Sequence, residues 1–308
     1  MSALLRTAEA PLQINKGLWL GLVGIVIFSV TLPMTRLAVG SLEAPQMSGM
    51  FIAAGRAVVA AALSAVFLLA TRAPLPRRAD WWPLAITAGG VVFGFPFLTS
   101  IAMRYVEAMH ASVIVGVLPL ATAAVGALLH RQRPSKGFWL CAALGSALVV
   151  AFALLKSGSA GGVSLRVADL LLLAAMLCAA VGYGYGARLS QRMRAEHVIC
   201  WALVISLPLT LPLAFISWPQ APVKAVAWWG FAYVAVFSMW LGFFAWYRGL
   251  ALGGTVRVSQ VQLVQPFLSM LFAVPLLGER LDAVTVGFAV AVIATVFIGK
   301  KMPVGVAK

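Results

Sequence analysis

Long apolar runs, separated by short polar stretches, extend along almost the whole chain. Each run is about 20 residues long, the length of helix that crosses the roughly 30 Å hydrocarbon core of a bilayer. The first five runs lie at 17–39, 47–71, 81–103, 108–130 and 137–155. The next five lie at 166–187, 198–216, 226–250, 255–278 and 283–299. The pattern predicts an all-α polytopic membrane protein with ten transmembrane helices embedded in the lipid bilayer.

The composition excludes several classes of protein. Of the 308 residues, 62% are hydrophobic and 10% are charged, whereas soluble domains have about 45–50% and 25%. A soluble fold cannot bury this much apolar surface, which argues against a soluble enzyme. The net charge of +15 could favour an acidic partner, but the basic residues lie between apolar runs, so we expect no nucleic-acid partner. The three cysteines form no Cys-x-x-Cys pair and indicate no disulfide framework.

Lysine and arginine are concentrated in alternate loops. They cluster near both chain termini and at 72–78, 131–136 and 188–194, whereas the loops between these hold few. Basic residues are retained on the cytoplasmic side of a membrane. Both termini are therefore expected in the cytoplasm, with the protein in a bacterial inner membrane as a monomer or weak homo-oligomer.

The second half of the chain resembles the first when the two are offset by 147 residues. Residues superimposed in this way are Trp81 with Trp228, Ser112 with Ser259, Pro119 with Pro266 and Leu129 with Leu276. The chain is predicted to consist of two five-helix repeats, 1–155 and 156–308, which form one integrated membrane domain. Because five is odd, the repeats must cross the membrane in opposite directions. Inverted repeats recur in secondary transporters, which bind substrate between the halves near the midplane.

Several of these segments also resemble a known family. Segments 108–134 and 255–282, each with a proline inside a helix, are similar to the paired signature of the drug/metabolite transporter superfamily, and closest to its EamA-type members. The second segment ends in Leu-Gly-Glu-Arg-Leu at 277–281, and Arg56 resembles an arginine of the family's second helix. The first segment departs from the pattern with Arg-Gln-Arg at 131–133. The resemblance implies ten helices and export of amino acids or other metabolites.

A polar face with a proline occurs at the same place in both halves. Ser259, Gln262 and Pro266 are spaced three and four residues apart, so they lie on one side of a helix. The equivalent positions in the first half include Ser112 and Pro119. Each proline leaves a backbone carbonyl without its helical partner, and in lipid such a group must find another. This face is predicted to line a substrate cavity; a kink with polar residues that join helices is the alternative.

Aromatic and hydroxyl side chains on other helices are further candidates for contact with a substrate. Such a mixture suits an amphipathic solute, although any one of these residues could instead serve packing. The candidates are Ser29, Thr31, Pro33, Phe95, Thr99, Met176, Tyr183, Ser238, Gly242, Trp246 and Tyr247.

Two ionisable residues lie inside apolar runs. Arg56 must face the interior of the bundle, where we expect it to meet carbonyl groups, a carboxylate such as that of Glu43, or a substrate carboxylate. His110 could titrate near neutral pH or be a hydrogen-bonded structural residue. All eight Asp and Glu residues fall in loops or at helix ends, so no intramembrane carboxylate for exchange of protons with lipophilic cations is expected.

The sequence thus predicts a secondary transporter, with no cofactor and no metal, that exports small amphipathic molecules by alternating access. The resemblance favours aromatic or other hydrophobic amino acids as substrates. One alternative is a multidrug or quaternary-amine exporter. Another is a membrane enzyme acting on lipid-linked substrates, for which the sequence offers no cluster of catalytic side chains.

Overall fold

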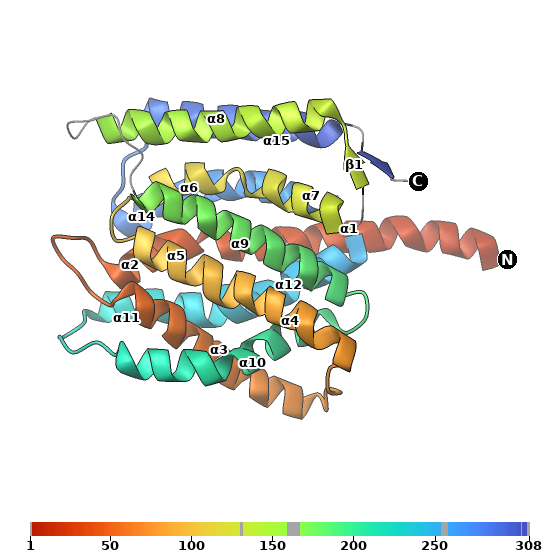
Figure 1. Ribbon diagram of the computed structural model, residues 1–308, viewed down its shortest axis with the longest axis horizontal. Coiled ribbons are helices and arrows are strands. Elements are labelled where there is room, and N and C mark those ends of the chain that lie inside the picture. The colour runs from red at the N-terminus through yellow and green to blue at the C-terminus, as the bar shows by residue number, and fades with distance from the viewer. Residues whose placement is uncertain (1, 130–131, 159–166, 254–257, 303, 307–308) are drawn as a thin grey trace.

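The computed structural model describes residues 2–129, 132–158, 167–253, 258–302 and 304–306. Its helices lie side by side and run between two ends of the molecule (Figure 1). The first and last described residues lie at one end, here called the termini end; the opposite one is the far end. The first half holds α1 Ser2–Ser29, α2 Thr31–Val39, α3 Gly49–Ala70, α4 Trp81–Ala88, α5 Phe95–Ala102, α6 Ala108–Val115, α7 Leu118–Leu129 and α8 Lys136–Gly158. The second half holds α9 Val167–Leu189, α10 Ala195–Ile216, α11 Ala225–Tyr233, α12 Gly242–Gly253, α14 Gln265–Leu277 and α15 Ala283–Lys301.

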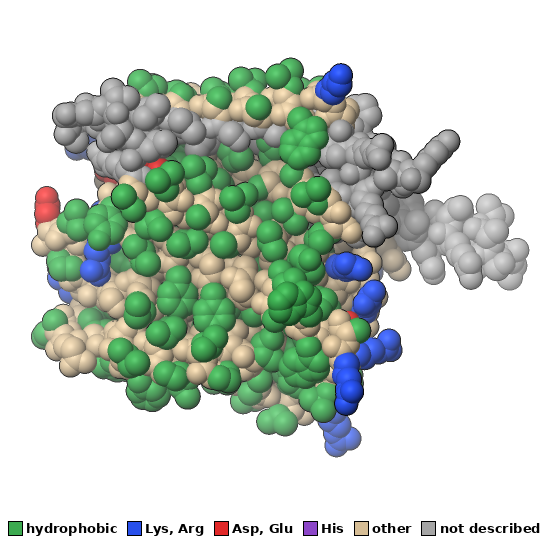
Figure 2. All heavy atoms as spheres, viewed as in Figure 1, with side chains coloured by type: hydrophobic (Ala, Val, Ile, Leu, Met, Phe, Trp, Pro, Cys, Tyr) green, Lys and Arg blue, Asp and Glu red, His purple; other side chains and the backbone are tan. Residues whose placement is uncertain are grey.

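These are the helices of a multi-pass membrane protein. Within the described chain, seven helical segments are long and apolar enough to cross a bilayer, and shorter apolar helices run over Val261–Leu277 and Ala283–Thr295. Each of the ten ranges expected from the sequence contains helix in its described part, and the number of ten crossings stays a prediction. Residues 254–257, where the expected 255–278 helix begins, lie outside the described residues. Figure 2 shows hydrophobic side chains covering the middle of one face, with Lys and Arg gathered mostly at the termini end.

The first long segment is broken between α1 and α2. Pro33 cannot donate a backbone hydrogen bond, so the carbonyl of Ser29, four residues earlier, has no helical partner there. The hydroxyl of Ser269 on α14 donates to that carbonyl oxygen at 2.7 Å. A backbone acceptor in an apolar environment must be paired. The break in the first half is therefore stabilised by a side chain of the second half.

Irregular helical segments recur at corresponding positions of the two halves. The π-helical segment η2 (Gly89–Gly94) separates α4 from α5, and η3 (Val234–Leu241) separates α11 from α12. The 3₁₀ segments η1 (Arg78–Asp80), before α4, and η4 (Ser259–Val264), before α14, do not correspond to each other in this way. Helices of the two halves begin 147 residues apart at Phe95 and Gly242, at Leu118 and Gln265, and at Lys136 and Ala283. The backbone thus follows the offset read from the sequence.

Corresponding segments pack in a reciprocal way. α3 packs along α10 and α8 along α15, and each of these pairs joins corresponding helices of the two halves, while α6 packs against α14, the counterpart of α7. α1 packs along α12, while α9 packs against α4, η2 and α5. Glycines permit the close approach of α1 to α12, because a Cβ at Gly249 would lie 2.7 Å from the backbone nitrogen of Gly21.

A short β-ribbon was not expected from the apolar pattern. β1 (Gln132–Pro134) pairs antiparallel with β2 (Val304–Val306), with Gln132 opposite Val306. The ribbon holds the end of the described chain beside the connection from α7 to α8, at the termini end (Figure 1).

Candidate functional site

A small cavity lies among helices of both halves, near the point where α1 passes into α2. The space open to the centre of a water molecule within it is about 20 Å³, enough for about one water. In this conformation it is therefore nearly closed. Its lining residues are Phe28, Thr31, Leu32, Arg56, Val91, Phe95, Ala179, Tyr183, Ser238, Met239, Phe243 and Gln265.

Both aromatic rings and hydroxyl groups line the cavity. The rings of Phe28 and Phe243 have centres 5.1 Å apart, and Tyr183 lies 6.1 Å from Phe243. The hydroxyls of Thr31, on α2, and Ser238, in η3, are hydrogen-bonded at 2.8 Å. That bond joins the two halves directly at the cavity. An apolar group and a polar group of one small solute could each find a matching surface here.

Arg56 brings a charged group to this cavity from the middle of α3. Its side chain is 2% exposed, and Ala53, Ala54 and Ala57 around it are fully buried. The Nε and Nη1 atoms have no hydrogen-bond partner among the described residues. The expected pairing with Glu43 is wrong, because Glu43 lies exposed in the 40–48 loop.

Five of the residues proposed from the sequence line this cavity. They are Thr31, Arg56, Phe95, Tyr183 and Ser238. Three other candidate hydroxyls bond to carbonyls of their own helices: Ser29 to Ile25, Thr99 to Phe95 and Ser112 to Ala108, at 2.7, 2.6 and 2.7 Å. These hydroxyls are paired within their own helices, and the three residues do not line this cavity.

Other candidates are buried in the bundle and do not line the cavity. Trp246 is fully buried, with its ring centre 5.7 Å from that of Tyr183, and the Tyr247 hydroxyl donates to the carbonyl of Gly182 at 3.3 Å. At Gly242, a Cβ would lie 2.7 Å from the ring of Phe28. Buried positions in helices are also occupied by Pro33, Met176, Pro119 and Pro266. The side chain of Ser259 lies outside those that the structure describes.

The 3₁₀ segment η4 changes which glutamine reaches the cavity. A 3₁₀ helix has 3.0 residues per turn and an α-helix 3.6, so six residues of 3₁₀ rotate the face by roughly 120° more. Gln265 consequently lines the cavity, a residue that the α-helical spacing did not select. Gln262 is 1% exposed, and both polar atoms of its amide lack a partner within the described chain. The signal that could have identified Gln265 was the cluster of three polar residues at 259–262 ahead of a proline, which favours a local change of helix type.

His110 lies away from the cavity, in a contact between the two halves. Its Nε2 is 2.6 Å from Oδ1 of Asp169, in the first turn of α9. Its ring lies 5.1 Å from that of Phe152 on α8. Asp169 is 1% exposed. It is a buried carboxylate inside a membrane-spanning helix, which the sequence pattern did not single out.

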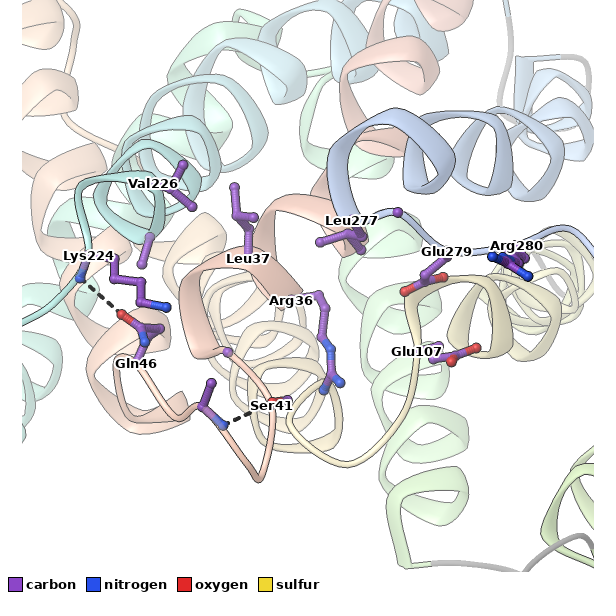
Figure 3. Close-up of a pocket in the computed structure, with 14 residues that line it drawn as sticks. Arg36, Leu37, Ser41, Gln46, Glu107, Lys224, Val226, Leu277, Glu279 and Arg280 are labelled. Atoms are coloured by element: carbon purple, nitrogen blue, oxygen red, sulfur yellow. Dashed lines mark hydrogen bonds between the residues drawn. The ribbon is translucent and has the colours of Figure 1, made fainter.

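A hollow of about 630 Å³ opens at the far end (Figure 3). Arg36 extends into it between the side formed by Gln46 and Lys224 and the side formed by Glu107 and Glu279. The Arg36 guanidinium donates to the carbonyl of Met103. On α2, Arg36 is five residues beyond Thr31, a rise of about 7.5 Å. A short stretch of α2 thus separates this hollow from the central cavity.

Glu279 caps a helix of the other half at the edge of that hollow. Its two carboxylate oxygens accept hydrogen bonds from the backbone nitrogens of Ala108 and Met109, at 2.7 and 2.8 Å. These N–H groups begin α6 and have no partner inside the helix. Burial raises the pKa of the Glu279 carboxyl, and the two backbone hydrogen bonds oppose that rise.

A second hollow, of about 590 Å³, opens at the termini end. Ion pairs lie beside it: Arg192 is 3.7 Å from Asp80, and Arg248 donates to Glu196 at 3.0 Å.

Aromatic rings pack together between Arg56 and the termini end of the bundle. Phe67 lies eleven residues beyond Arg56 on α3, and its ring packs against His197, Trp240 and Phe244, at 6.2, 6.2 and 5.0 Å between ring centres.

The chain is similar to known transporters over nearly its whole length. The model of the EamA-like transporter family matches twice, over residues 15–155 and 166–299. The uncharacterized transporter YdeK of Bacillus subtilis (strain 168) is 42% identical over 285 residues, which cover 91% of this chain and 96% of that protein. A protein of known crystal structure has a similar fold, with a TM-score of 0.64 and 18% identity, over 92% of this chain and 96% of the other. At 18% identity that last likeness shows the fold alone.

Proposed function

Since this chain belongs to the EamA-like transporter family and is a membrane transporter, we propose that it exports small amphipathic metabolites by alternating access. Amino acids with aromatic or other hydrophobic side chains are the substrate class. The observation that carries the proposal is the nearly closed cavity, lined from both halves by aromatic, hydroxyl and amide side chains, with an open hollow at each end.

Alternating access requires that the halves separate first at one end of the cavity and then at the other. The proposed arrangement is two inverted repeats, 1–155 and 156–308, with the substrate held between them. The contacts between the halves at the cavity include polar ones that must break. The Thr31–Ser238 hydrogen bond is one, and the bond from Ser269 to the carbonyl of Ser29 is another.

The barriers toward the two ends differ in this conformation. A rise of about 7.5 Å along α2 lies between the cavity and the far-end hollow. Toward the termini end the rings of Phe67, Trp240 and Phe244 pack against one another. Because Lys and Arg gather at the termini end (Figure 2), we assign that end to the cytoplasm. Opening toward the far end would then release substrate outward.

Counterflow in proteoliposomes tests the proposal. Vesicles loaded with unlabelled phenylalanine or leucine should take up the labelled amino acid in a saturable way, at a rate that rises with the internal concentration. Empty liposomes and vesicles loaded with glucose are the controls. Uptake that is linear in concentration, or equal to that of empty liposomes for every amino acid, would contradict the proposed function.

A reversible cross-link tests the movement. The variant Thr31→Cys/Ser238→Cys, with Cys141, Cys178 and Cys200 replaced by alanine, places two thiols where hydroxyls lie 2.8 Å apart. Oxidation should stop counterflow and reduction should restore it. Each single-cysteine variant should be insensitive to both treatments. Full transport by the oxidised double variant would show that the halves do not part at this contact.

A further inference from the structure

Arg56 is costly to keep where it lies. A charged side chain near the middle of a membrane helix is unfavourable even when inserted by the cellular machinery. Buried donors without partners add to that cost, and both Nε and Nη1 of Arg56 lack one among the described residues. The position itself does not require a polar group. Leu203, 147 residues later on α10, is fully buried at the corresponding place in the other half.

Arg56 borders the central cavity, whose lining includes it. The described residues that line this cavity include no Asp or Glu. A cationic solute entering it would meet an uncompensated positive charge in a low-dielectric surrounding, where like charges repel strongly. An anionic group would instead supply the missing partner.

A carboxylate fits this partner in geometry as well as in charge. Guanidinium groups bind carboxylates through paired N–H donors, and such charge-assisted bonds are among the strongest that proteins make. The other polar side chains that line the cavity can accept hydrogen bonds: the hydroxyls of Thr31, Tyr183 and Ser238 and the amide oxygen of Gln265. They suit an ammonium group, while Phe28, Phe95 and Phe243 suit an apolar side chain.

We propose that Arg56 binds the carboxylate of the transported solute, so that the chain carries organic carboxylates and rejects the corresponding amines. The inference rests on the proposed function, since it takes the central cavity as the transport site. It adds a rule that the proposed function lacks: the carboxylate is required and the ammonium group is not. A multidrug or quaternary-amine exporter is excluded by the same rule.

A set of phenylalanine analogues tests the rule. Phenylalanine and 3-phenylpropionate keep the carboxylate, whereas phenethylamine and phenylalaninamide lack it. Counterflow in proteoliposomes and thermal stabilisation of the purified protein in detergent are measured for each, since a ligand that binds the folded state raises its apparent stability. The first two compounds should be transported and should stabilise the protein. The last two should do neither.

Substitution of Arg56 separates binding from folding. Arg56→Gln should weaken binding of both carboxylates at least 100-fold, and Arg56→Lys, which keeps the charge without the fork, should weaken it less. Because the substitution removes a buried charge whose Nε and Nη1 have no partner among the described residues, Arg56→Gln should unfold at the same temperature as the wild type or higher. Ser64→Ala is the matched control. Ser64 is a buried polar residue on the same helix that does not line the cavity, and its variant should bind and transport normally.

The outcomes separate the inference from the proposed function. Transport of phenethylamine or tetraphenylphosphonium at rates like that of phenylalanine overturns the role of Arg56 and leaves a transporter. Unchanged carboxylate affinity in Arg56→Gln does the same. Absence of saturable transport for every compound overturns the proposed function. Stabilisation by carboxylates in the wild type, lost in Arg56→Gln, would still support the anion site in that case.

Discussion

In each half a π-helical segment ends one residue before an α-helix begins: at Gly94 and Phe95 in the first half, and at Leu241 and Gly242 in the second. The side chains at corresponding positions are unlike. Arg56 corresponds to Leu203, and Gln262 corresponds to Val115. The two halves therefore share irregular backbone and differ in chemistry.

This difference shows how a duplicated fold can hold an asymmetric site. Backbone breaks weaken long helices at the depth where the halves meet, and both halves need them. Under the proposed function, the polar groups that line the cavity need to occur only once, because the solute has one carboxylate and one apolar side chain. Thr31 and Arg56 come to the cavity from the first half, and Ser238 and Gln265 from the second.

The largest loss of stability is expected when the second half is given an arginine at the position that corresponds to Arg56. Leu203→Arg would place a second guanidinium at the position equivalent to Arg56, in a site that is fully buried and apolar. The arginine alone costs about 3 kcal/mol in a membrane helix, and overpacking adds about 1–3 kcal/mol. We expect little folded protein, measured by gel filtration of the detergent extract.

Leu203→Met is the matched control, because it changes shape without charge and should cost less than about 1.5 kcal/mol. Normal expression and stability of Leu203→Arg would mean that position 203 reaches water or a carboxylate, and that the two positions are not equivalent in depth.

The next largest loss of stability is expected at the His110–Asp169 pair, which joins the two halves away from the cavity. Asp169→Asn removes the charge beside His110 in a buried pair with a separation of 2.6 Å. Breaking such a pair costs about 3 kcal/mol or more when the remaining partner stays buried. Thermal unfolding in detergent should show a large decrease, and the double variant His110→Leu/Asp169→Asn should recover part of it. Additive losses in the double variant would show that the two side chains do not act together.

The sequence was sufficient for most of the architecture, because a helix that crosses a bilayer needs a length of apolar residues that little else provides. It also located the offset between the halves, from residues such as Pro119 and Pro266. The α-helical spacing failed where the helix is not α-helical. The face drawn through Ser259, Gln262 and Pro266 assumed 3.6 residues per turn, and η4 has three.

Long-range pairing was the second limit. The partner of His110 is 59 residues away in the sequence and that of Thr31 is 207 residues away, and no local pattern joins them. The lack of a partner for Nε and Nη1 of Arg56 among the described residues is equally a property of the packed bundle. Prediction from the pattern could place the arginine inside the membrane but could not tell that these two nitrogens would find no partner in the part of the chain that the structure describes.

A smaller effect is expected at the glycine contacts that both halves use. Gly249→Ala would bring a Cβ to 2.7 Å from the backbone nitrogen of Gly21, and Gly90→Ala would bring one to 2.8 Å from that of Gly182. Since neither backbone can yield freely, each variant should lose about 1–3 kcal/mol of stability. Gly287→Ala on α15 is the control, because nothing lies within 4 Å of its Cβ, and it should be neutral or gain up to about 1 kcal/mol. A loss in only one of the two helix contacts would show that the halves are not held together in the same way.

The smallest effect is expected at Glu279, whose counterpart in the first half is Gln132. Glu279→Gln makes the halves alike there and keeps an acceptor for the N–H groups of α6. Because burial raises the pKa of Glu279 in the folded protein, folding favours the protonated form. Its contribution to stability is fully present below the unfolded pKa of about 4.3 and is lost as pH rises through the folded pKa. The melting temperature of the wild type should therefore fall relative to that of Glu279→Gln as the pH rises between these two pKa values, by on the order of 1 °C.

Glu107→Gln is the control for this prediction. It removes a nearby negative charge that also raises the pKa of Glu279, so it should reduce the difference in melting temperature without abolishing it. Parallel melting curves for the wild type and Glu279→Gln from pH 4 to 8 would mean that the two backbone hydrogen bonds offset the burial completely.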